Sequence, residues 1–96
     1  MRIEYHPSVR QDVADVMRCY KAVSDRLAGE FKAELLCTIA LAAANPGRFH
    51  SVKPHFHRAN LKRFPYHFIY REIAGGIRVT LVRHHRRFPD VGMERR

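Results

Sequence analysis

The chain has 96 residues, of which 46% are hydrophobic, including six Phe and four Tyr; this composition predicts a single folded domain over residues 1–96 and excludes a disordered segment. The net charge of +9 lies in one half, because residues 1–46 hold six Lys/Arg and six Asp/Glu, whereas residues 47–96 hold twelve and three, with six of the seven histidines. This asymmetry predicts a neutral scaffold joined to a surface that meets an anionic partner, either a nucleic acid or an acidic protein.

The two cysteines, Cys19 and Cys37, fall within helix-like patterns and form no C-x-x-C pair. We predict two buried thiols, although one disulfide between the helices stays open as an alternative. The absence of a dense cysteine framework favours a reducing, cytoplasmic compartment. The longest apolar stretch, Leu35–Ala44, is shorter than the about 20 residues that a membrane-spanning helix requires, so no membrane partner is expected.

The N-terminal quarter predicts a short strand and then a helix. Residues Arg2–His6 alternate in polarity and suit a strand that Pro7 ends. Ser8 is the predicted N-cap of the helix, and Gln11 is its capping-box partner. The apolar residues that follow at helical spacing are predicted to face the core: Val9, Val13, Val16, Met17, Tyr20 and Val23.

A second helix is predicted after a break at Ser24–Gly29, and Asn45-Pro46-Gly47 is a strong stop signal for it. Two helices with a short connection form an antiparallel hairpin. The apolar stripe of the second helix consists of Phe31, Leu35, Ile39 and Ala42.

The second half predicts three strands. Gly75-Gly76 supplies the positive φ that a tight hairpin turn requires. The predicted segments are a loop at Gly47–Pro54 and strands at His55–Phe64, Tyr66–Ile73 and Ile77–Arg83, followed by a basic end at Arg83–Arg87. The fold class is therefore α+β, with an N-terminal strand and an α-helical hairpin packed on a small, mainly antiparallel sheet.

The alternation within the hairpin predicts which side chains face the helices. Tyr66, Phe68 and Tyr70 are expected on the core face together with Ile77, Val79 and Leu81. His67, Ile69 and Arg71 are expected on the other face, which is predicted to stay open, with the basic run at its rim.

Two kinds of chemistry fit the basic run. Arginine offers a planar fork for phosphate, and histidine exchanges a proton near neutral pH. Cleavage of RNA by attack of a 2′-OH would use His67, His85 and Arg63 as candidate catalytic residues. Binding without chemistry would instead present basic side chains to an acidic partner, so whether the protein is an enzyme stays open, with binding favoured. The candidate target-binding residues are Arg71, Arg83, His84, Arg86 and Arg87.

Motifs for cofactors and metals are weak. The pairs His55-x-His57 and His84-His85 lack an accompanying Cys pair or H-E-x-x-H, so no metal site is predicted. There is also no Gly-rich phosphate loop, and no cofactor is expected.

The whole chain, and the segment Arg63–Pro89 in particular, resembles the RelE/ParE superfamily of toxins from type II toxin–antitoxin systems. The order of elements matches, and so do several short phrases. These phrases are Asn45-Pro46, Leu61-Lys62-Arg63-Phe64-Pro65-Tyr66, Ile69-Tyr70-Arg71, and Val79–Val82 leading into His84-His85-Arg86-Arg87-Phe88-Pro89.

The resemblance implies a bacterial growth-inhibiting toxin of a plasmid-stabilisation system. A cognate antitoxin would neutralise it and would form a hetero-oligomer with it. RelE-like members cut messenger RNA inside the ribosome, whereas ParE-like members poison DNA gyrase. The R-F-P-Y phrase and the His84-x-x-Arg87-x-Pro89 ending look more similar to the ParE side.

Only some functional residues of the RNA-cutting members have counterparts in this chain. Their strand arginine corresponds to His67, their second arginine to His85 or Arg86, and their lysines loosely to Arg58 and Lys62. They also use a C-terminal tyrosine, where this chain has Val91-Gly92-Met93. The resemblance therefore favours a ParE-like toxin that binds DNA gyrase; the alternatives are a ribosome-dependent mRNA endoribonuclease and a non-toxic nucleic-acid-binding module.

Overall fold

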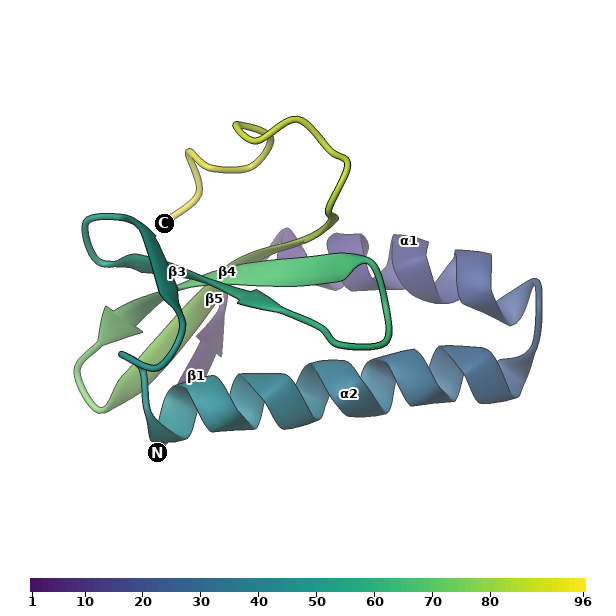
Figure 1. Cartoon of the computed structure of the whole chain (residues 1–96), viewed down its shortest axis with the longest axis horizontal. Helices are drawn as coiled ribbons and strands as arrows, with labels where there is room; N and C mark the ends of the chain where they lie inside the picture. Colours follow the sequence, from purple (N-terminus) through teal and green to yellow (C-terminus); the bar gives the residue numbers. More distant parts are fainter.

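A computed structural model describes all residues, 1–96, and has two helices packed on one face of a five-stranded sheet (Figure 1). The strand order is β1-β5-β4-β3-β2, with β1 parallel to β5 and the other neighbours antiparallel. The predicted α+β class and the mainly antiparallel sheet are confirmed. The elements are β1 (Arg2–Tyr5), α1 (Val9–Lys21), α2 (Asp25–Ala44), β2 (His50–Lys53), β3 (Phe56–Asn60), β4 (Tyr66–Ile73) and β5 (Gly76–His84).

The first helix begins after Ser8 as predicted, but the capping at both helix N-termini differs from the prediction. Ser8 has helical backbone angles and makes no side-chain cap, so the predicted capping box is wrong; its amide donates instead to Nδ1 of His6 at 3.1 Å. Ser24 is the residue that caps, because its extended backbone lets Oγ accept from the amide of Leu27 at 3.0 Å. The predicted break at Ser24–Gly29 is therefore too long, and α2 begins at Asp25.

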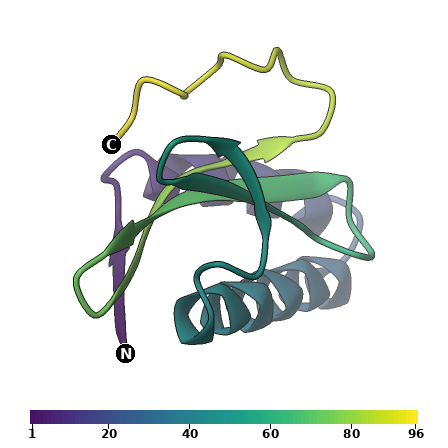
Figure 2. The ribbon, with the colours of Figure 1, turned by 60° about the vertical axis from the view of Figure 1, so that its left-hand side comes forward.

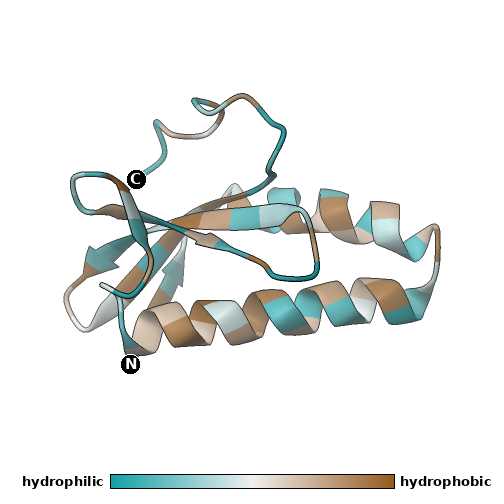
Figure 3. Cartoon of the chain, in the orientation of Figure 1, coloured by the Kyte–Doolittle hydropathy of each residue, from teal (hydrophilic) through white to brown (hydrophobic).

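The apolar stripe of α2 is confirmed, since all four predicted positions are buried. In Figure 3, brown hydrophobic bands recur along α2 between teal ones, as an amphipathic helix requires. Val23, by contrast, lies beyond α1 and is exposed. The prediction of buried thiols is wrong: Cys19 and Cys37 are both free and exposed. Neither helix is long and apolar enough to cross a membrane.

The sheet has one more strand than predicted. The loop expected at Gly47–Pro54 contains the edge strand β2, which pairs with β3. The strand expected at His55–Phe64 is shorter and ends at Asn60. The chain leaves the sheet there because the amides of Lys62 and Arg63 donate to the carboxylate of Glu34 on α2, at 2.5 and 3.2 Å.

A β-bulge at Thr80 changes the face of the second half of β5. Val79 pairs with Tyr70 and Leu81 pairs with Ile69, which leaves Thr80 as the extra residue; its hydroxyl donates to the carbonyl of Ile69 at 3.3 Å. A bulge shifts the alternation of side chains by one residue. Leu81 therefore packs away from the helices, contrary to the prediction, and Val82 takes its place in the helix-side core.

The face opposite the helices is covered by the chain itself. Residues 85–96, which we call the tail, cross this face on the side of the sheet away from α2 (Figures 1 and 2). Beneath the tail, Phe56, Ile69 and Leu81 form a second small core against which Met93 packs. The predicted open face is therefore closed over its centre, and it is accessible only around the tail.

Candidate functional site

Arginine and histidine side chains from β3, β4, β5 and the start of the tail come together where β4 begins and β5 ends. The antiparallel register brings this about, because His67 of β4 lies between Asn60 of β3 and Arg83 of β5. We call the group the cation cluster. Its members are Arg58, His67, Arg83, His84, His85, Arg86 and Arg87.

His67 is the buried centre of the cation cluster, with 1% of its surface exposed. Its Nε2 accepts a hydrogen bond from Nε of Arg83 at 2.9 Å. Its Nδ1 lies 2.9 Å from Nδ1 of His85, and the two rings are within 8° of parallel. Because arginine only donates, Nε2 of His67 carries no proton, and the proton on Nδ1 points to His85. Arg58 donates to the same nitrogen of His85 at 3.3 Å.

Burial and neighbouring cations keep both imidazoles uncharged. Burial is the largest cause that lowers the pKa of His67 to about 3, and the charges of Arg58 and Arg83 lower it further. The pKa of His85 is lowered by burial and then by Arg58. Both rings are therefore neutral at neutral pH, and neither is prepared to donate a proton as an acid. Because His67 is buried, it cannot itself contact a substrate.

Arg83 is an internal anchor. Besides its bond to His67, its Nη1 donates to the carbonyl oxygens of Pro89 at 2.7 Å and Val91 at 2.8 Å. The guanidinium thus fastens the tail to the end of β5. The sequence predicts Arg83 as a contact for a partner, but most of its donors are used within the chain.

His84, Arg86 and Arg87 form the accessible part of the cation cluster. The ring of His84 stands edge-on to Tyr66 at 5.0 Å, and its Nδ1 accepts from the amide of Arg86 at 3.0 Å. Arg86 and Arg87 are exposed, and neither forms an ion pair. Their charges are therefore free to meet an anionic partner.

Two predicted site residues lie outside the cation cluster. Arg63 pairs with Glu30 of α2 at 3.2 Å, on the helix side of the molecule. Arg71 lies four residues further along β4, opposite Arg78 of β5. The structure thus brings His67 and His85 together and keeps Arg63 and Arg71 apart from them.

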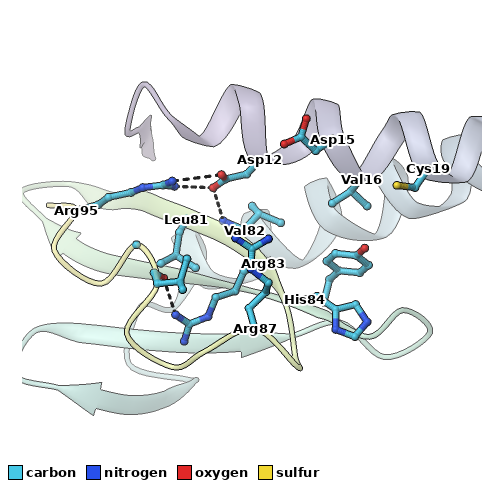
Figure 4. Close-up of a pocket in the computed structure, with 13 residues that line it drawn as sticks. Asp12, Asp15, Val16, Cys19, Leu81, Val82, Arg83, His84, Arg87 and Arg95 are labelled. Atoms are coloured by element: carbon cyan, nitrogen blue, oxygen red, sulfur yellow. Dashed lines mark hydrogen bonds and ion pairs between the residues drawn. The ribbon is translucent and has the colours of Figure 1, made fainter.

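A groove lies between α1 and the part of β5 that extends beyond its pairing with β1, and it contains residues that the sequence did not indicate as functional (Figure 4). It has a volume of about 260 Å³. Asp12 reaches across it from α1, accepts from the amide of Val82 at 3.0 Å and binds Nη1 of Arg95 at 2.6 Å. This pair holds the tail against the helix layer. One feature of the sequence could have identified Asp12: it lies on the same helical face as Val9 and Val16, which are buried, and a carboxylate there needs a partner.

A second groove lies between the end of β1 and the two helices and has a volume of about 480 Å³. Its walls are mostly apolar, and its charged side chains are cationic. The residues that line it are Tyr5, His6, Pro7, Val9, Arg10, Val13, Lys32, Leu35, Leu36, Ile39 and Val82. Such a groove suits a partner with an apolar face and acidic flanks.

The histidines considered as metal ligands do not converge. His57 stacks on Tyr70, and its ring nitrogens contact the carbonyl of Phe49 at 3.0 Å and the carboxylate of Glu72 at 3.1 Å. Nowhere in the chain do three or more His, Cys, Asp or Glu side chains gather in a way that would hold a metal ion. His57 thus supports the packing of β3 on β4.

Comparison with protein-family models gives no match, and comparison with curated proteins gives none. Among solved structures, the chain is similar to one described as the chromosomal ParDE TA system from P. aeruginosa. The TM-score is 0.74 at 16% sequence identity, and the match covers 88% of this chain and 95% of the other. At this identity the likeness shows a common fold.

Proposed function

We propose that the chain is the toxin of a type II toxin–antitoxin system. It acts by binding a cellular protein of the DNA gyrase kind, and a cognate antitoxin neutralises it. The fold shared with a chain of a ParDE system supports the toxin assignment, and so does the family resemblance of Arg63–Pro89. Plasmid stabilisation is the biological role that this assignment implies.

The observation that carries the choice of binding over RNA cleavage is the state of the histidine pair. Cleavage by a 2′-OH requires an accessible base and an accessible acid. His67 is 1% exposed with its pKa lowered to about 3, so it supplies neither. The accessible cations Arg86 and Arg87 suit recognition of an acidic protein surface, where complementary charge guides association.

The antitoxin is proposed to dock in the groove between β1 and the helices. Apolar side chains such as Val13 and Leu35 line this groove, and Arg10 and Lys32 add positive charge without a compensating carboxylate. The matching occupant is an acidic amphipathic helix that folds on binding. Its apolar face would fill the groove and its carboxylates would meet Arg10 and Lys32.

A ribosome-dependent mRNA endoribonuclease is the second candidate. One feature favours it: His85 is exposed, its pKa is lowered, and Arg58 lies 3.3 Å away. To act as a general base, His85 would exchange the hydrogen bond that its Nδ1 accepts from His67 for one with the substrate. An acid partner would have to come from the ribosome or the substrate.

Induced expression in bacteria, followed by a supercoiling assay with purified gyrase and a translation-coupled RNA cleavage assay, tests the proposal. The wild-type protein should stop growth and inhibit supercoiling. The double variant Arg86→Ala/Arg87→Ala should lose inhibition by at least about tenfold, as expected for two interface arginines. The matched control removes the same charge from two exposed residues elsewhere, Arg48→Ala with Lys21→Ala, and should stay active.

The double variant His67→Gln/His85→Gln separates the two candidate functions. A protein that acts by binding should keep its toxicity in this variant. Loss of toxicity together with loss of specific mRNA cleavage, in a variant that still folds, would replace the gyrase proposal with the endoribonuclease.

A further inference from the structure

A pocket at the opposite end of β4 from the cation cluster is lined by Arg71, whose guanidinium has one nitrogen without a hydrogen-bond partner. The pocket has a volume of about 340 Å³ and lies between the β2–β3 turn, β4 and the end of the tail. Nε of Arg71 is shielded from solvent there and has no hydrogen-bond partner. A buried donor left unpaired costs about 1–3 kcal/mol, so the site lacks an oxygen that would accept this bond.

The charges around Arg71 are also unbalanced. Arg71 lies directly opposite Arg78 on the neighbouring strand, and like charges in this position repel each other. Arg78 is compensated, because its Nη1 donates to Glu4 at 3.3 Å and its Nε donates to the main-chain oxygen of Arg96 at 3.1 Å. Arg71 has no ion-pair partner.

The remaining walls of the pocket are mainly basic. Arg96 and His55 line it together with Arg71, and its one carboxylate side chain, Glu72, contacts Nε2 of His57 through Oε2 at 3.1 Å. Pro54 and Phe56 complete the lining and contribute no charge. The pocket therefore combines an unpaired guanidinium with two further basic groups and one carboxylate that is already engaged.

We propose that this pocket binds a phosphate group, either free phosphate or the terminal group of a small phosphomonoester. The planar fork of an arginine matches phosphate oxygens, and phosphate carries enough charge and acceptors for Arg71, Arg96 and His55 together. Ligand pockets usually measure about 300–1,000 Å³, so this one suits a small group. The site is independent of Arg86 and Arg87, and it extends beyond the proposed toxin function.

The test is an NMR titration of the wild-type protein that follows the Nε–Hε signal of Arg71. Inorganic phosphate, adenosine monophosphate, acetate and sodium chloride are added at matched ionic strength. Phosphate should shift the signal to saturation and raise the melting temperature, while chloride does neither. If adenosine monophosphate also saturates the site, the phosphate group of a larger molecule is accepted; if it does not, the site takes the free anion.

Two variants make the result specific. Arg71→Gln should weaken phosphate binding by at least about tenfold, the effect of one charge-assisted hydrogen bond, whereas Arg86→Gln should bind as wild type. If Arg71→Gln does not fold, the phosphate titrations of Arg71→Lys and of the wild-type protein test the proposal instead. Unsaturable binding, equal stabilisation by acetate, or unchanged binding in the Arg71 variant would overturn the proposal. Because toxicity is read out separately through Arg86 and Arg87, failure of one proposal leaves the other standing.

Discussion

His85 lies on His67 with Nδ1 of each ring 2.9 Å from that of the other, and Arg83 bonds the remaining nitrogen of His67 at 2.9 Å. The pair links β4 to the segment that follows β5. His67 accepts a hydrogen bond from Arg83 and lies close to the charges of Arg83 and Arg58. A protonated His67 would lose this acceptor and would repel both arginines. This arrangement has consequences for stability that can be measured.

The stability of the fold should fall as the pH is lowered below the ordinary histidine range. The pKa of His67 is lowered from 6.5 to about 3 in the folded chain, chiefly by burial. Above pH 6.5 the ring is neutral in both states, so the native arrangement is fully stable. Between pH 6.5 and 3 only the unfolded state takes up the proton, which lowers the free energy of unfolding by about 1.4 kcal/mol per pH unit.

Urea unfolding at several pH values measures this dependence. His67→Gln should reduce the pH dependence of the free energy of unfolding by about 1.4 kcal/mol per pH unit. His50→Gln, at an exposed position of β2, should leave this pH dependence unchanged. An identical slope in wild type and His67→Gln would show that His67 is not the group responsible.

Removing Arg58 should raise the pKa of His85. Burial and then the charge of Arg58 lower this pKa, and Nη2 of Arg58 lies 3.3 Å from Nδ1 of His85. Arg58→Gln deletes the charge, so the protonated ring becomes easier to form. NMR titration of the His85 ring gives the pKa directly. Arg63→Gln is the control, since Arg63 pairs with Glu30 on α2, away from His85. An unchanged pKa of His85 in Arg58→Gln would contradict the contact between Arg58 and His85.

The ion pair between Asp12 and Arg95 should hold the tail in place. Both side chains are largely buried, at 17% and 21% exposure, so the pair is screened less than a surface pair. Arg95→Gln should expose residues 88–96 to hydrogen exchange and limited proteolysis while the helices and strands stay protected. Asp12→Ala should cost more, about 1–3 kcal/mol of global stability, because the amide of Val82 also loses its acceptor. Arg10→Gln, on the same helix and without an ion pair, should change neither the protection of the tail nor the global stability. If the tail of Arg95→Gln were protected as well as that of the wild type, the pair would not hold the tail in place.

Gly75 in the β4–β5 turn and Gly76 at the start of β5 should respond differently to alanine. Gly75 has φ of 81° and open space around it, so Gly75→Ala costs only the strain of a left-handed residue, about 1 kcal/mol. At Gly76, a Cβ atom would overlap the backbone of Arg2, which pairs with Gly76 in the parallel β1–β5 ladder. Gly76→Ala should therefore displace β1 and cost at least twice as much in thermal unfolding. Equal effects would mean that β1 is not docked as described.

Local patterns were enough to predict the fold class and most of the core. The stripe of α2, the faces of Tyr66, Phe68 and Tyr70, and a tight turn that uses the positive φ of Gly75 follow from periods of 3.6 and 2 residues and from backbone freedom at glycine. The turn itself consists of Ala74 and Gly75, because Gly76 already belongs to β5. All of these depend on near neighbours in the sequence. The capping box at Ser8 failed for a related reason: Ser8 has helical backbone angles, and its amide already had an acceptor in His6.

The basic character of the second half and its resemblance to a toxin family could also be read from the sequence. Only the tertiary structure decided which of those cations remain available. The bulge at Thr80 turned Leu81 toward the tail, the tail used the donors of Arg83, and burial made His67 a neutral acceptor. Each outcome depends on contacts between residues far apart in sequence, and on desolvation, which a sequence pattern does not contain.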